Sequence, residues 1–142
     1  MYMDAQARPS LAQSLAVAAG TTVSTDSIDL LAAVDNPGRS GTPLRAYAVI
    51  TTTLTGGTSV QAQFIQSANS NLSSPDVLLS GPVVAEASAL AGTVLLDAPL
   101  PDVTKRYVGF QYVTVGTTAA GAVTAGVVGQ TDRNSTTIPM NI

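Results

Sequence analysis

The chain has 142 residues, the usual size of one domain, and only 11% of them are charged, with a net charge of −3. It contains no histidine, cysteine or tryptophan, which excludes a Ser-His-Asp triad, a thiolate nucleophile, a zinc knuckle and a disulfide. We expect no nucleic-acid partner, because the acidic balance repels phosphates and few aromatic rings are available for base stacking.

Residues 1–20 are interpreted as an N-terminal arm, because they contain few turn signals. The apolar stretch at residues 11–19 is interrupted by Gln13 and Ser14, and no run reaches the ~20 apolar residues that span a bilayer. We therefore expect neither a membrane partner nor a signal peptide.

The chain beyond this arm is rich in Thr and Val and poor in Lys and Glu, a bias that favours strands over helices. Turn residues divide it into about eight short segments. These predicted strands are residues 23–31, 44–54, 59–66, 77–79, 83–85, 93–96, 105–115 and 122–130.

Two features in the middle of the chain predict an antiparallel sheet. Residues 55–58 read Thr-Gly-Gly-Thr, which is typical of a tight hairpin turn. After this turn, Val60, Ala62 and Phe64 alternate with glutamines. Such alternation indicates a strand with one buried and one solvated face.

Together these segments predict an all-β fold, an antiparallel β-sandwich of jelly-roll-like type with about eight strands. The sandwich is expected over residues 21–130, with extended arms at residues 1–20 and 131–142. Helix is expected only as a turn or two, near residues 11–18 or 85–91.

The carboxylates include two close pairs, Asp26 with Asp29 and Asp97 with Asp102. A glycoside hydrolase needs two carboxyl groups that face one cleft. These aspartates instead fall at predicted strand ends and turns, where capping and solvation explain them. We therefore expect no catalytic residue.

Metal and cofactor sites are not expected either. The loop oxygens at residues 35–36 and 69–71 have no third carboxylate nearby to complete a calcium site. The sequence Gly56-Gly57-Thr58 lacks the lysine of a phosphate-binding loop.

Lys105 and Arg106 form the only adjacent basic pair, and they begin a predicted strand. We interpret them as rim ion pairs or as protection of a strand edge. Contact with an acidic partner is the alternative.

Large apolar residues occupy both ends of the chain, although free termini are commonly polar and frayed. We expect these arms to pack on their own subunit or on a neighbour. The candidate contact residues, taken together with basic side chains, are Tyr2, Met3, Arg8, Lys105, Arg106, Ile138, Met140 and Ile142.

An ordered set of segments carries a family resemblance between about residue 20 and residue 130. These segments are residues 27–30 (SIDL), 57–64 (GTSVQAQF), 73–75 (SSP), 106–112 (RYVGFQY) and 121–128 (GAVTAGVV). In this order they resemble the small capsid cement, or decoration, proteins of tailed double-stranded DNA phages, of the Bordetella-phage type.

The resemblance implies a jelly-roll-like virion protein without enzymatic activity. Such a protein is made in the host bacterial cytoplasm, and it oligomerises most commonly as a homodimer, with a trimer as the alternative. On the outer capsid surface it ties neighbouring copies of the major capsid protein together, so that the shell resists the internal pressure of DNA. The low charge of the chain agrees with this role, because such a surface suits an assembly better than a free monomer.

Two other functions stay open. One is a phage tail or receptor-binding β-domain, for which aromatic residues are few at 4%. The other is a glycan hydrolase that uses Asp97 together with Glu86 or Asp102.

Overall fold

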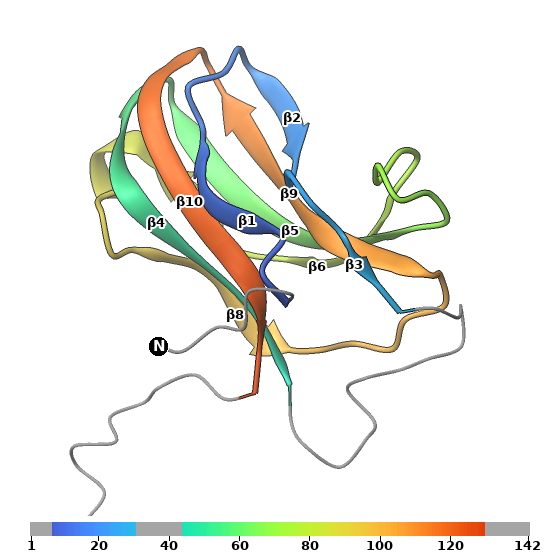
Figure 1. Cartoon of the computed structure of the whole chain (residues 1–142). Coiled ribbons are helices and arrows are strands. Elements are labelled where there is room, and N and C mark those ends of the chain that lie inside the picture. The colour runs from blue at the N-terminus through green and yellow to red at the C-terminus, as the bar shows by residue number, and fades with distance from the viewer. Residues whose placement is uncertain (1–6, 31–43, 130–142) are drawn as a thin grey trace, which may run out of the picture.

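The computed structural model of the chain describes residues 7–30 and 44–129, and it shows two antiparallel sheets packed face to face (Figure 1). The predicted fold class, an all-β antiparallel sandwich, is confirmed. The loop at residues 35–36 and the predicted arm at residues 131–142 lie outside the described residues.

One layer is a four-stranded sheet. Its strands, in spatial order, are β1 (Ser10–Ser14), β10 (Thr118–Val128), β4 (Arg45–Gly56) and β8 (Val94–Pro99). Ala48 on β4 lies opposite Ala125 on β10 and Leu96 on β8. All of these side chains are buried, so this row faces the other sheet.

The second layer is a six-stranded sheet built around the pair β5–β9. Its strands are β2 (Gly20–Val23), β9 (Tyr107–Val115), β5 (Ser59–Ser67) and β6 (Asp76–Ser80), with β3 (Ile28–Asp29) paired to β9 and β7 (Val84–Ala85) paired to β5. Val60, Ala62 and Phe64 on β5 are fully buried, as their alternation predicts.

The central strands of the two sheets are continuous with one another along the chain. β4 continues into β5 and β9 continues into β10, but the two members of each pair lie in different sheets. β4 pairs with β10 in one sheet, and β5 pairs with β9 in the other. The strand order β1-β10-β4-β8 against β2-β9-β5-β6 is that of a jelly roll.

The predicted hairpin turn at residues 55–58 is therefore wrong, because the chain crosses there from one sheet to the other. Gly56, Gly57 and Gly116 sit in the two crossings with φ of 75°, 75° and 77°, a region that side chains disfavour. A Cβ on Gly116 would lie 2.9 Å from the Cα of Gly57, so glycine also allows the two crossings to touch.

Four connections between the sheets lie side by side at one end of the sandwich (Figure 1). We call this the crossover end, and it comprises residues 15–19, 56–58, 86–93 and 115–118. Backbone hydrogen bonds of 2.7–3.0 Å join neighbouring connections. The end contains the short 3-10 helix η3 (Glu86–Ser88), which confirms the helical turn expected within residues 85–91.

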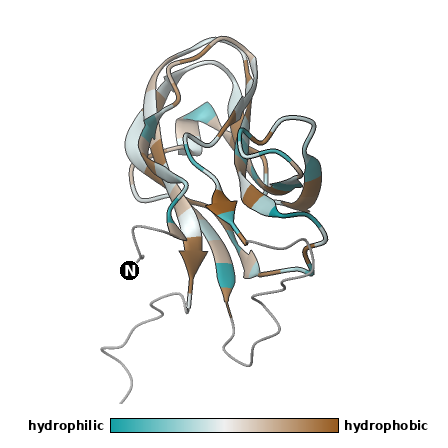
Figure 2. Cartoon of the chain, turned by 45° about the vertical axis from the view of Figure 1, so that its right-hand side comes forward, coloured by the Kyte–Doolittle hydropathy of each residue, from teal (hydrophilic) through white to brown (hydrophobic). Residues whose placement is uncertain are grey.

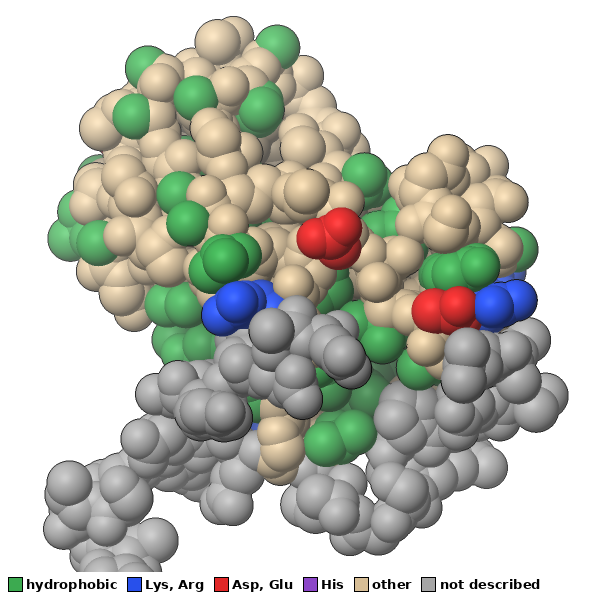
Figure 3. All heavy atoms as spheres, viewed as in Figure 1, with side chains coloured by type: hydrophobic (Ala, Val, Ile, Leu, Met, Phe, Trp, Pro, Cys, Tyr) green, Lys and Arg blue, Asp and Glu red, His purple; other side chains and the backbone are tan. Residues whose placement is uncertain are grey.

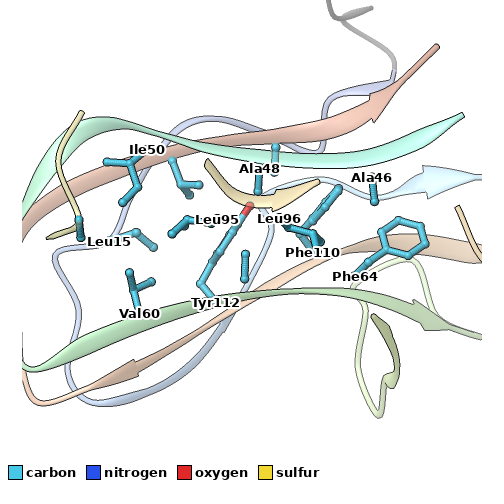
Figure 4. Close-up of a cluster of buried hydrophobic side chains, with 14 of the residues drawn as sticks. Leu15, Ala46, Ala48, Ile50, Val60, Phe64, Leu95, Leu96, Phe110 and Tyr112 are labelled. Carbon is cyan, nitrogen blue, oxygen red and sulfur yellow. The ribbon is translucent and has the colours of Figure 1, made fainter. Parts of the chain in front are cut away.

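The space between the sheets is filled by one cluster of apolar side chains (Figure 4). The rings of Phe64 and Phe110 meet edge to face there, with centroids 5.3 Å apart. Leu15, Ile50 and Leu95 extend the cluster, and all of these side chains are buried.

The first part of the chain differs from its predicted form. Within the predicted arm at residues 1–20, Ser10–Ser14 is strand β1, so the helical turn expected at residues 11–18 is wrong. Two buried contacts explain this. Leu15 is fully buried in the core, and the Tyr112 hydroxyl on β9 donates a 2.7 Å hydrogen bond to Ser10 Oγ. Burial raises the pKa of Tyr112, which keeps this donor protonated.

Little of the predicted strand at residues 23–31 is a strand: Val23 ends β2, Ile28–Asp29 forms β3, and residues 24–27 belong to neither. Ser24 lies at the break. Its hydroxyl donates to the carbonyl of Asp26 and accepts a hydrogen bond from the backbone N–H of Phe110. The Ser24 side chain thus accepts a hydrogen bond from β9 just after the end of β2.

Candidate interaction surfaces

Five of the predicted contact residues, Tyr2, Met3, Ile138, Met140 and Ile142, lie outside the described residues. Arg8 is half-buried just before β1. Lys105 and Arg106 directly precede β9. The described part of the chain therefore brings together only Lys105 and Arg106 of the predicted set.

Lys105 and Arg106 are engaged in ion pairs within the chain. Lys105 Nζ lies 2.7 Å from Asp76 Oδ2 on β6, and it holds the pKa of Asp76 below its usual value. The Arg106 guanidinium donates two hydrogen bonds, of 2.7 and 2.8 Å, to the carboxylate of Asp29 on β3. These bonds raise the pKa of the Arg106 guanidinium. Arg106 also lies over the ring of Tyr107, 5.2 Å from its centroid. The predicted rim ion pairs are thus confirmed.

A third ion pair joins Arg45 on β4 to Asp97 on β8, with Nε 2.7 Å from Oδ1. Burial, and then the charge of Asp97, raises the pKa of the adjacent Tyr47.

Glu86, the proposed partner of Asp97 in hydrolysis, lies in η3 at the crossover end, whereas Asp97 lies toward the other end of β8. Residues 7–30 and 44–129 hold no group of three or more His, Cys, Asp or Glu side chains that could bind a metal ion.

The charges of the described residues are distributed unevenly. The pairs Asp29–Arg106, Arg45–Asp97 and Asp76–Lys105 all lie at the end of the sandwich opposite the crossovers. The four crossover segments contain one charged residue, Glu86. Figure 3 shows no charged side chain at the top of the visible face, where these segments lie. In Figure 2, strongly hydrophilic segments are short and separated.

A row of amide side chains, Gln61, Gln63 and Gln111, crosses the outer face of the six-stranded sheet; we call it the amide row. Gln111 Nε2 donates to Gln63 Oε1, and Gln63 Nε2 donates to Gln61 Oε1 at 3.4 Å. Gln61 Nε2 donates to the carbonyl of Gly81 at 2.8 Å. The predicted solvated face is in fact half-buried or buried at these positions. The alternation of β5 reveals Gln61 and Gln63, but only the pairing with β9 adds Gln111.

A protruding loop at residues 68–74 borders the amide row, and Figure 1 shows it curling away from the sheet between β5 and β6. From composition it is simply a polar loop. Its one large apolar side chain, Leu72, is buried on the outer face of the sheet. We call this segment the 68–74 loop.

These features define a jelly-roll β-sandwich in which three ion pairs join oppositely charged side chains of the same chain. No helix among the described residues is long and apolar enough to cross a membrane. A family model described as Bbp16 matches residues 11–127. The chain therefore belongs to the Bbp16 family, a family of Bordetella phage proteins. A search of curated proteins finds no match.

Proposed function

We propose that this protein is a structural component of the phage particle, a cement protein that binds the outer surface of the major capsid protein lattice and stabilises it. The observation that carries this proposal is the family match over residues 11–127. It covers nearly the whole described sandwich, so the match concerns the fold as a unit and not one motif.

The surface chemistry supports a role through protein–protein contacts. Three ion pairs among the described residues hold Arg45, Lys105 and Arg106 to aspartates of the same chain. Paired charges offer little attraction to a charged partner, so a shell subunit would be bound through uncharged groups and shape. Many copies of a weak contact give high avidity on a repeating lattice.

Self-association is the second part of the proposal. We propose that the protein acts as a homodimer, with a trimer as the alternative, because two linked copies bind two shell subunits at once. Light scattering on the purified full chain measures this state directly. A strictly monomeric mass at micromolar concentration would contradict it.

Shell stability tests the cement function. Particles that lack the protein are heated beside particles to which the purified protein has been added back, and release of DNA is recorded. A cement protein raises the temperature of release, because binding to the assembled lattice stabilises it by mass action. Equal release temperatures, with the protein bound, would contradict cementing; an absence of binding would contradict shell recognition altogether.

A further inference from the structure

The 68–74 loop is held in one conformation by its own hydrogen bonds. Ser67 Oγ donates to the carbonyl of Ser73 at 2.6 Å and accepts from the N–H of Asn69. Asn69 Nδ2 donates to Ser73 Oγ at 2.9 Å. The N–H of Ser73 donates to Asn71 Oδ1 at 3.1 Å. These bonds leave little freedom to the loop, although it stands outside both sheets.

A buried side chain fastens the loop to the sheet. Leu72 is 1% exposed, and a Cβ on Gly109 of β9 would lie 2.4 Å from Leu72 Cδ1. Only glycine at this position lets the leucine sit on the outer face of the sheet. Gly109 lies opposite Ile65 on β5, which is also fully buried. The loop is thus anchored by an apolar contact apart from the main core.

Two residues of the loop have backbone conformations that are costly for residues with side chains. Leu72 has φ of 59° and Ser74 has φ of 47°, a region that residues with side chains rarely adopt. Such conformations persist only where the surrounding contacts over-determine them, and they concentrate at functional sites.

The groups that the loop exposes are small and uncharged. Ala68, Asn69, Ser70 and Asn71 form its exposed tip, and none of them is ionisable. The amide row continues this neutral polar surface along the sheet. Amides and hydroxyls can donate to and accept from uncharged polar groups, including the backbone groups of another protein.

We propose that the 68–74 loop is a preformed recognition element that docks on an uncharged protein surface of the phage shell. This inference rests on the proposed function and names the part of the molecule that makes the contact. Because the loop is ordered before binding, little conformational entropy is lost on association. Because no charge takes part, the affinity depends weakly on salt.

The test is binding of the full chain to purified shells that lack it, with wild type compared to Ser70→Glu. The Ser70 side chain is exposed, and only its backbone carbonyl is used, as the acceptor for Ser27 Oγ. The substitution therefore keeps the loop intact and puts a carboxylate at its tip. Ser88→Glu, at an exposed position of η3, is the matched control.

We expect Ser70→Glu to weaken binding by about tenfold or more, because an unpaired carboxylate would be desolvated in the contact. Ser88→Glu should bind within about twofold of wild type. Wild-type affinity should change by less than about threefold between about 0.05 and 0.5 M salt. Three outcomes would overturn this inference but leave the proposed function standing. They are equal binding of wild type and Ser70→Glu, equal losses of binding in Ser70→Glu and Ser88→Glu, and a steep salt dependence of wild-type binding. Failure of wild type to bind any shell would overturn the proposed function itself.

A second variant tests the preformed shape. Leu72→Asn removes the anchor but keeps a residue type that tolerates positive φ. We expect faster amide hydrogen exchange at residues 69–73, an unchanged far-UV spectrum, and weaker shell binding than wild type. A loosened loop that binds shells as wild type does would overturn the inference.

Discussion

Phe64 and Phe110 join the two sheets at the centre of the sandwich. Their rings lie edge to face at an interplanar angle of 66°, and both side chains are fully buried. Phe64 is foreseeable from the alternation of β5, because a period of two places it on the inner face. Its aromatic partner is not, because the register of β5 against β9 joins residues far apart in sequence.

Replacing Phe64 by Ala is expected to lower the free energy of unfolding by about 3–5 kcal/mol, because it leaves a cavity in a closed core. Urea denaturation measures the change. Val83→Ala is the control: Val83 is 65% exposed, so its truncation should change stability by less than about 0.5 kcal/mol. Similar effects of the two substitutions would contradict the assignment of the core.

Replacing Gly116 by Ala is expected to lower the free energy of unfolding by about 1–2 kcal/mol or more, because its positive φ is costly for a side chain. The added Cβ would also press on Gly57. Thermal or urea unfolding measures this cost. Gly129→Ala is the control: its new methyl group meets no atom within 4 Å, so the free energy of unfolding should stay unchanged. An unaffected Gly116→Ala would show that the two crossings do not need glycine.

At the scale of elements, the β4–β5 and β9–β10 crossings show what local sequence can and cannot predict. Thr-Gly-Gly-Thr correctly predicts a sharp reversal after β4, because glycine accepts the required φ. The same residues are compatible with a hairpin within one sheet and with a crossing from one sheet to the other. What decides between a hairpin and a crossing is the pairing of β4 with β10, whose paired residues lie more than sixty positions apart in the sequence.

The candidate surfaces divide in the same way. The ion pairs of Lys105 and Arg106 follow from their position before a strand, whereas their aspartate partners come from β6 and β3. The burial of Leu72 within a polar loop has no local signal at all. It depends on Gly109, which leaves a space on the neighbouring strand.

The Lys105–Asp76 pair predicts a specific pH dependence. The hydrogen bond from Lys105 lowers the pKa of Asp76 in the folded state from the ordinary value of 3.8. Its stabilisation is therefore present above pH 3.8 and is lost as the pH falls through the lower pKa of the folded state. Carboxyl NMR titration should show this pKa depressed in wild type and raised again in Lys105→Met. The same pKa in both proteins would contradict the pairing.

At the scale of the whole molecule, the paired charges lie at one end and the crossover segments at the other are almost free of charge. Away from the ion pairs the sandwich exposes mainly uncharged side chains, among them apolar ones such as Leu90 and Val115, together with the anchored 68–74 loop. This distribution suits repeated contact with a protein lattice better than attraction to a charged polymer.

The apolar ends of the chain carry a prediction that concerns binding and not folding. Deleting residues 1–6 together with 136–142 should leave the sandwich folded and weaken shell binding by about tenfold or more. The deletion stops before Pro9, which is buried and whose carbonyl accepts a 2.9 Å hydrogen bond from Asp26. Circular dichroism and shell binding provide the two readouts. Unaltered binding would show that the ends make no contact with the shell.

The number of copies per particle tests the cement function most directly. Quantitative mass spectrometry on purified virions measures this protein against the major capsid protein. We predict a copy number comparable to that of the major capsid protein, because a cement protein follows the symmetry of the whole lattice. A handful to a few dozen copies would place the protein in the tail, and its absence from the particle would contradict a structural role.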